Sequence, residues 1–294
     1  MISLAIEVLS ILAPSAFLAL IGIVWYHRGP EYPIKFVTTL VVDVGMPALL
    51  FYTLATSKIE ILELARMAFA ALLVHLIIVP LAIIALKVAN KDWRLCVAMS
   101  VGNTGNLGLP ICLFAFGEEG LAYAMAFFSV QVLLLFSFGD AVYAGRANIA
   151  KTLRSPVLIC VVIGVIFRLS GFDLPEVVAD TTKLLGQLVI PIMLITLGVS
   201  LAGMRAKHFP SALLWSSIRI ILTMAVGFSL AHILGFTGVA RGVLILETVV
   251  PVAVFNFLLL VRHDRDPSEV SSLILVTHLA AIIYLPIVLA LLLR

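Results

Sequence analysis

The chain has 294 residues, of which 63% are hydrophobic and 12% are charged, and its mean hydropathy is +1.20. Soluble globular domains contain roughly half apolar and a quarter charged residues, so this composition excludes an ordinary soluble protein. The net charge is only +3, and its distribution among the loops is more informative than its size.

Runs of about twenty apolar residues, bounded by charges or by Gly and Pro, predict ten membrane-spanning helices. The N-terminus lacks the basic residues of a signal peptide, so we expect the first run to be retained as a span. The expected spans are 5–26, 34–56, 64–88, 93–116, 119–144, 155–170, 178–203, 209–234, 239–261 and 269–293.

The second span contains Asp43, four residues before a mid-span proline, Pro47. Ionisable residues inside a membrane are costly to bury, so each is a candidate functional residue. Asp43 either carries a coupling proton or binds a cation, or else forms a hydrogen bond to a neighbouring helix, which is the interpretation we favour.

The fourth span is interrupted at its centre by the sequence GNTGNLGLP, residues 102–110. Three glycines, two asparagines and a proline in nine positions cannot hold a regular helix. In a membrane, irregular backbone is tolerated only where it faces protein or a water-filled cavity. A broken span near the midplane therefore predicts a transporter binding site.

Within this break, the amide of Asn103 can donate to an anion and accept from a hydroxyl, although it can also simply cap the next half-helix. We expect Gly102, Thr104 and Asn106 to lie at the same site. The glycines allow unusual backbone conformations and the close approach of neighbouring helices. Pro110 predicts a kink in the helix that follows.

The ninth span contains Glu247, four residues before Pro251. Pro251 predicts a second break opposite the first, with Val250 and Val252 within reach of a substrate. Two half-helix N-termini would then face a carboxylate without requiring a buried Arg or Lys. Glu247 either takes part in coupling or pairs with a basic residue, Arg241 or Arg219. In the tenth span, His278 is a further candidate for the site.

The two halves of the chain share landmarks. Pro47 and Pro191, each in a span interior, are 144 residues apart, and Asn103 and Pro251 are 148 apart. With five spans in each half, the halves 1–146 and 147–294 must have opposite orientations. The sequence therefore predicts an inverted repeat with a broken helix at the same place in each half.

Lys and Arg are unevenly divided between the two sets of alternating loops, twelve against six. Basic residues concentrate in cytoplasmic loops, so we expect both termini to be periplasmic. The richer set is Arg28, Lys35, Lys87, Lys91, Arg94, Arg146, Lys151, Arg154, Arg205, Lys207, Arg262 and Arg265, and the other is Lys58, Arg66, Arg168, Lys183, Arg241 and Arg294.

Several motifs occur in order along the chain: MPALLF at 46–51, GNT at 102–104 with GLP at 108–110, SPVL at 155–158, PIML at 191–194 and Pro251. In this order they resemble the auxin efflux carrier family, in particular bacterial relatives of the plant PIN auxin exporters. The resemblance implies an all-α fold of two inverted five-helix repeats. It also implies a homodimer in which helices 1, 2, 6 and 7 form a scaffold and helices 3–5 and 8–10 form a transport domain. The implied function is organic-anion export by an elevator-type motion, and the resemblance implies that Gln131 belongs to the site.

The chain departs from the plant carriers in two respects, Gly102 in place of Pro and a short loop between spans five and six. These departures, and the apolar Val252, weaken auxin as the substrate. We therefore expect a bacterial inner-membrane transporter of small carboxylates, auxin-like or dicarboxylate. Its expected partners are the anion, the bilayer and a second copy, with no nucleic acid, cofactor, metal or catalytic residue.

Two other functions fit the sequence less well. A sodium- or proton-coupled symporter or antiporter of the bile-acid type would need a dense carboxylate cluster at the break, which the sequence lacks. An intramembrane aspartyl protease could use Asp43 and Asp140, but the first glycine of its Gly-x-Gly-Asp motif is replaced by Ser137. Asp140 is more simply explained as solvated or paired with Arg146.

Overall fold

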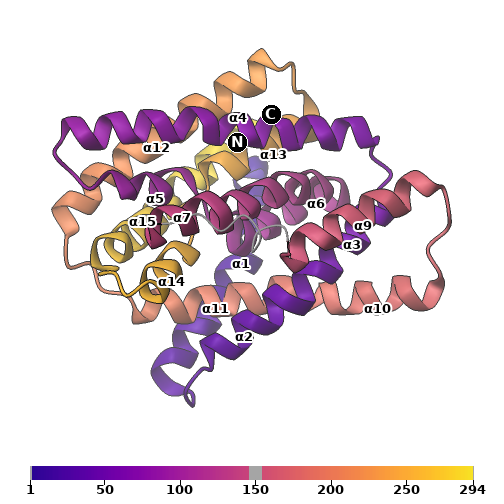
Figure 1. Cartoon of the computed structure of the whole chain (residues 1–294), viewed down its shortest axis with the longest axis horizontal. Coiled ribbons are helices and arrows are strands. Elements are labelled where there is room, and N and C mark those ends of the chain that lie inside the picture. The colour runs from indigo at the N-terminus through magenta and orange to yellow at the C-terminus, as the bar shows by residue number, and fades with distance from the viewer. Residues whose placement is uncertain (1, 146–153, 294) are drawn as a thin grey trace.

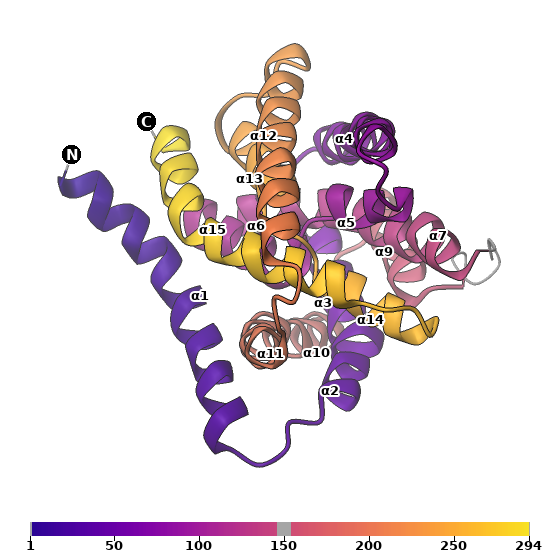
Figure 2. The same ribbon diagram turned by 90° about the vertical axis from the view of Figure 1, so that its left-hand side faces the viewer.

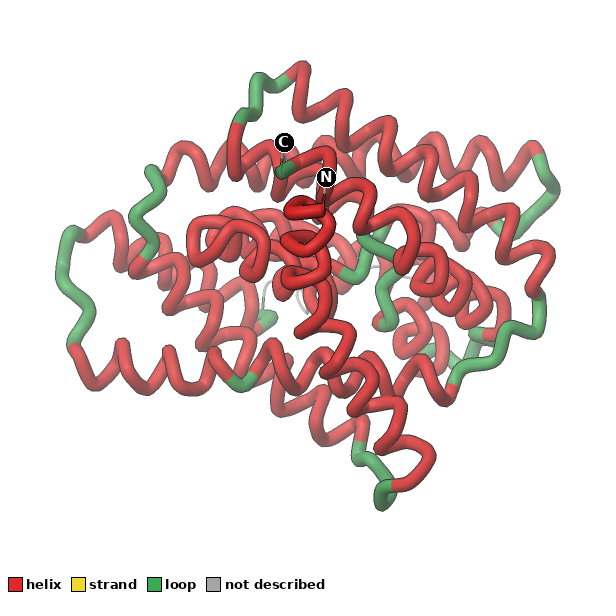
Figure 3. Tube along the Cα trace, turned by 180° about the vertical axis from the view of Figure 1, so that it is seen from behind, coloured by secondary structure: helices red, strands yellow, loops and turns green. Residues whose placement is uncertain are grey.

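The computed structural model describes residues 2–145 and 154–293 of the chain. Throughout these residues the regular elements are helices, with no strand (Figure 3). Seven of the described helices are long and apolar enough to cross a membrane. The prediction of an all-α membrane protein is therefore confirmed. The expected boundary between the two halves, at residues 146 and 147, lies outside the described residues.

Among residues 2–145 the helical elements form four long stretches and one short stretch, 93–100. Their elements are α1 (Ile2–Arg28), α2 (Ile34–Leu40), η1 (Val41–Gly45), α3 (Met46–Thr56), α4 (Ile61–Val88), η2 (Trp93–Leu95), α5 (Cys96–Ser100), η3 (Thr104–Gly108), α6 (Leu109–Leu134), η4 (Leu135–Gly139) and α7 (Asp140–Ala144). The second half contains α9 (Pro156–Ser170), α10 (Glu176–Gln187), α11 (Val189–Gly203), α12 (Phe209–Ile233), α13 (Gly238–Val249), α14 (Phe255–Arg262) and α15 (Ser268–Leu292).

Proline and glycine positions explain most helix interruptions. Pro191 has no N–H to bond with the carbonyl of Gln187, and α10 accordingly ends there before α11 begins at Val189. Pro47 follows the wide π-helical turn η1, a form that commonly accommodates a local irregularity in a helix. Gly117 has φ +65° and bends α6. This residue lies between the expected end of the fourth span, at 116, and the expected start of the fifth, at 119.

The helices form two groups (Figures 1 and 2). In the first group, α1 packs along α11, and α3 packs along α9 and α10. Gly22 lies against the carbonyl of Ile195, and Gly198 against that of Ala19. Any side chain at these glycines would collide with the neighbouring backbone, so small residues allow α1 and α11 to pack closely.

In the second group, α6 packs on α4 and α13, and α12 packs on α13, α15 and α4. Figure 2 shows α4 and α12 on one side of α6, with α10 and α11 of the first group on the other. The two chain termini lie near each other in Figures 1 and 2. The two groups meet around the interrupted part of the fourth and ninth spans.

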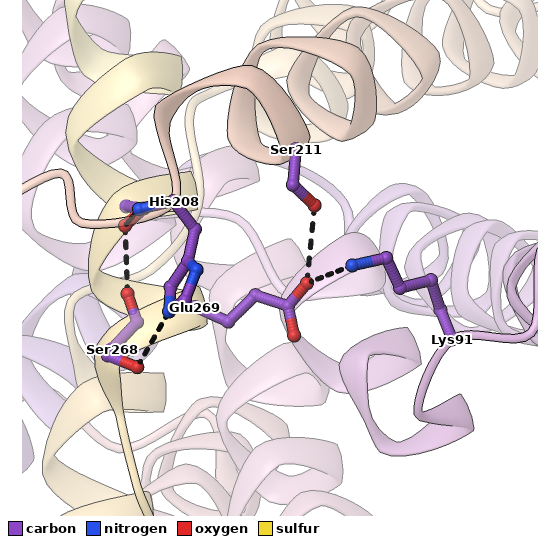
Figure 4. Close-up of polar contacts among 6 residues, drawn as sticks. Lys91, His208, Ser211, Ser268 and Glu269 are labelled. Atoms are coloured by element: carbon purple, nitrogen blue, oxygen red, sulfur yellow. Dashed lines mark hydrogen bonds and ion pairs between the residues drawn. The ribbon is translucent and has the colours of Figure 1, made fainter.

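Polar contacts join one end of α4, α12 and α15 (Figure 4). Glu269 Oε1 accepts hydrogen bonds from Lys91 Nζ at 3.1 Å and from Ser211 Oγ at 3.3 Å. His208 Nε2 lies 3.3 Å from Ser268 Oγ. Each such surface contact contributes at most about 1 kcal/mol, but together they link three helices of the second group into one unit.

Candidate functional site

Two extended segments cross at the centre of the molecule. One is residues 101–103, between α5 and η3, and the other is residues 250–253, between α13 and α14; we call the pair the crossing. Gly102 and Val252 pair there in antiparallel orientation. The N–H of Asn103 donates to Pro251 O at 2.6 Å, and the N–H of Ala253 donates to Val101 O at 3.1 Å. The two broken segments thus provide hydrogen-bond partners for some of each other's backbone groups, and irregular backbone in a membrane needs such partners.

Gln131, on α6, holds the first segment through both ends of its amide. Its Nε2 donates to Gly102 O at 2.8 Å and to Thr104 Oγ1 at 2.5 Å, and its Oε1 accepts from the N–H of Gly102 at 3.3 Å. On the second segment, the N–H of Val252 donates to Thr277 Oγ1 at 3.2 Å. Side chains of α6 and α15 therefore replace the missing helical hydrogen bonds.

Asn103 and His278 meet across the crossing. Asn103 Nδ2 lies 3.1 Å from His278 Nε2, and His278 Nδ1 lies 2.8 Å from the carbonyl of Ile274. A carbonyl can only accept, so Nδ1 carries the proton and Nε2 of the neutral ring accepts from Asn103. The carbonyl oxygen of the Asn103 amide and its second N–H remain available to a ligand.

A small cavity of about 30 Å³ adjoins the crossing. Its polar lining comes from Asn103, Thr104, Asn106 and Gln131, and its apolar lining includes Met193 on α11. This volume holds about one or two waters. The amide of Asn106 forms no side-chain hydrogen bond with the described residues, although the residue is only 6% exposed.

Two further cavities follow this one through lining residues that neighbouring cavities share. The second, also about 30 Å³, shares Asn106 and Met193 with the first. The third, about 410 Å³, shares Ser200 with the second and is lined by two exposed basic residues, Arg205 and Lys207, and by one exposed acid, Asp266. Shared lining residues thus connect the three cavities in a series that begins at the crossing.

Other predicted site residues lie at the crossing but do not line the cavity. Val250, Pro251 and Val252 are buried, and they contribute backbone groups to the crossing rather than cavity-lining side chains. Pro110 lies at the start of α6, after the π-helical turn η3. Asp43 is exposed on η1, away from the cavity.

The buried acid near the crossing is Glu247, 1% exposed on α13. Cys112 Sγ donates to its Oε1 at 3.5 Å, and its Oε2 has no partner among the described residues. A Cβ at Gly108 would lie 2.5 Å from Oε2, so a glycine there makes room for the carboxyl group. Within the described part of the chain, Glu247 pairs with neither Arg241 nor Arg219, so that alternative is wrong.

The structure places a residue at the crossing that the sequence analysis did not assign to the site. Arg219, on α12, is 0% exposed and donates from Nη2 to Val250 O at 2.8 Å. Its Nε and Nη1 have no partner among the described residues. The sequence does contain a feature that points to this residue, because a lone Arg in an apolar span is a candidate functional residue.

The proposed aspartyl pair is not assembled in the described residues. Asp140 Oδ1 lies 2.8 Å from His263 Nε2, between α7 and the end of α14. Asp43 belongs to the other group of helices and shares no hydrogen bond with Asp140 in the parts of the chain that the structure describes.

Comparison with known proteins gives consistent matches. A family model described as membrane transport protein matches residues 30–148 and 141–289. An uncharacterized transporter of Methanothermobacter thermautotrophicus is 30% identical over 208 residues, which cover 68% of this chain and 68% of that protein. An uncharacterized transporter of Methanocaldococcus jannaschii is 27% identical over 264 residues, which cover 83% of this chain and 84% of that protein.

Proposed function

Because the chain belongs to the family of membrane transport proteins that includes the auxin efflux carriers, we propose that it is a secondary transporter of small organic anions. The observation that carries the proposal is the cavity at the crossing. Its polar lining consists of amide and hydroxyl groups, from Asn103, Thr104, Asn106 and Gln131. Among the described residues, no Asp or Glu lines it.

This chemistry supports an anion rather than a cation as the substrate. Amide N–H groups donate hydrogen bonds to a carboxylate, and Asn106 has no competing side-chain partner within the described residues. The series of cavities supports the same assignment, because the cavity of about 410 Å³ is lined by two basic residues, Arg205 and Lys207, against one acid, Asp266. An excess of positive charge along a cleft raises the local concentration of anions.

The two groups of helices support an elevator-type mechanism. In this proposal α1–α3 and α9–α11 are the scaffold, while α4–α7 and α12–α15 form the transport domain. The cavity is lined from both groups, by Met46 and Met193 on the first and by Asn103 and Asn106 on the second. Sliding of the second group would carry the crossing past the two methionines and expose the site on the opposite face.

The remaining architectural proposals follow from the sequence. We propose that ten spans form two inverted repeats, that the protein is a homodimer in the cell membrane, and that both termini are periplasmic. The close termini in Figure 2 are in keeping with an even number of spans. The small cavity volume of about 30 Å³ is in keeping with a state in which the site is closed around little more than water.

Proton coupling is the second candidate, favoured by the buried, unpaired Oε2 of Glu247. The cavity itself lacks an acidic group among the described residues, so we prefer uncoupled transport driven by the substrate gradient and the membrane potential. That potential contributes about 2.3 kcal/mol per charge per 100 mV.

The test is transport by the purified protein in proteoliposomes. Labelled benzoate, indole-3-acetate and succinate are loaded, and their exchange is measured at neutral pH with and without sodium. We expect exchange of at least one carboxylate, independent of sodium and inhibited by the unlabelled compound. Exchange of none of these anions, by protein that is folded and inserted, would contradict the proposal.

A further inference from the structure

The positively charged side chain of Arg219 lies next to both segments of the crossing. The guanidinium of Arg219 is fully buried, and its Nη2 donates to Val250 O at 2.8 Å on one broken segment. On the other segment, a Cβ at Gly102 would lie 3.4 Å from the same nitrogen. Gly102 lines the cavity and Arg219 does not, so one glycine separates the charge from the cavity.

Within the described residues, this charge has no counter-ion. Nε and Nη1 of Arg219 lack hydrogen-bond partners there, and the side chain forms no ion pair with an acid. The titratable groups near enough to interact with it are His75, His278 and Tyr284. Tyr284 donates its hydroxyl to Val249 O, and His278 is held as the neutral tautomer.

An unpaired buried charge is among the most costly features a protein can contain, and Arg cannot lose its proton to avoid that cost. The buried acid Glu247 can be neutralised by a proton, because it has no cationic partner in the described structure. We therefore count one positive charge at the crossing and no negative one.

We infer that Arg219 is the counter-charge of the transported anion and makes the loaded transport domain electrically neutral. The inference rests on the proposed function. Arg219 acts through the crossing as a positioning residue, because it holds Val250 O and places its charge behind Gly102 without touching the cavity.

This assignment determines which step of the cycle responds to voltage. With a monovalent anion bound, the moving domain carries one negative and one positive charge, so its movement transfers no net charge. The empty domain carries only the charge of Arg219, so its return is voltage-dependent. Without Arg219 the situation reverses, because the loaded domain is negative and the empty one neutral.

The experiment compares two transport modes in proteoliposomes clamped with potassium and valinomycin. Labelled benzoate or indole-3-acetate is used, whichever the wild type exchanges faster. When substrate saturates both sides, exchange requires only movement of the substrate-loaded transport domain. Net efflux into substrate-free buffer also requires the empty transport domain to return. For the wild type we expect exchange to be unaffected by a change of 100 mV. Net efflux should change by up to about fifty-fold, the limit for one charge crossing the whole field.

Variants separate charge from structure. Arg219→Lys keeps the charge and should retain the wild-type pattern, whereas Arg219→Gln should make exchange voltage-dependent and weaken anion binding. Arg241→Gln removes an exposed arginine from α13 and should change neither mode. If Arg219→Gln does not fold, the wild type and Arg219→Lys still decide the question through the two modes.

The possible failures are distinguishable. Absence of carboxylate exchange by the wild type overturns the proposed function. Wild-type exchange that responds to voltage as strongly as net efflux overturns only the charge assignment. An Arg219→Gln variant with the wild-type voltage pattern overturns it as well.

Discussion

At the scale of single residues, the crossing is held by polar side chains that each replace a lost helical hydrogen bond. Gln131 bonds both backbone groups of Gly102, and Thr277 accepts from Val252. Asn106 differs from these residues, because its buried amide bonds to no described side chain or backbone group while it lines two adjoining cavities. A polar group without a described protein partner at a cavity is free to bond water or a ligand.

Asn106→Ala and Asn103→Ala should separate ligand contact from structure. Asn106→Ala removes no protein hydrogen bond, so we expect an unchanged melting temperature and weaker transport, by up to about tenfold for one hydrogen bond. Asn103→Ala also leaves His278 Nε2 without its donor, so we expect abolished or strongly reduced transport and a loss of about 1–3 kcal/mol of stability. Uptake assays and melting curves in detergent measure both effects. Wild-type transport by both variants would place the substrate site elsewhere.

Glu247 provides a test of proton coupling. We expect Glu247→Gln to leave the pH dependence of transport unchanged, because the cavity lining contains no described acid and the carboxyl faces Cys112 instead. Flux at fixed potential and varied pH, with a proton-sensitive dye inside the vesicles, measures this. Proton uptake that follows substrate one-for-one and disappears in Glu247→Gln would show that the second candidate function is correct.

At the scale of elements, the two interruptions are predictable because helix-breaking residues cause them. Residues 102–110 and Pro251 indicated the positions of both breaks, and the similar offsets of the proline and asparagine landmarks indicated that they correspond. The hydrogen bonds that join the breaks were not predictable, because they depend on how α6 and α15 are rotated about their axes. Gln131 and His278 were therefore identified only as candidates, without their partners.

Pro251→Ala and Pro251→Gly form a matched pair that tests whether the break in the ninth span is needed. Alanine restores the missing N–H and favours helix, so α13 can extend and transport should fall strongly. Glycine also restores the N–H but disfavours helix by about 1 kcal/mol relative to alanine, so it should preserve the break and most of the transport. Initial rates in proteoliposomes compare the two. Equal rates would mean that the hydrogen bonds of the crossing hold the segment open without the proline.

At the scale of the whole molecule, composition was sufficient to predict a helical membrane protein, since no other spanning structure suits such continuous apolar runs. The side-chain environment of single residues was harder to predict. Asp43 is exposed on η1, whereas Arg219 is fully buried at the crossing. Both lie in apolar spans, and a span that is apolar on all sides gives little indication of which face meets the protein interior.

The distribution of basic residues predicts the orientation of the molecule in the membrane. Lys207 is exposed and lines the large cavity, and it belongs to the set of twelve basic residues expected in the cytoplasm; the exposed Lys58 belongs to the set of six expected outside. In a background without Cys96, Cys112 and Cys160, we expect Lys58→Cys to react with an impermeant maleimide in intact cells. Lys207→Cys should react only after the membrane is opened, because positively charged loops are retained in the cytoplasm. The reverse labelling pattern would place the termini in the cytoplasm, and the large cavity would then open to the outside.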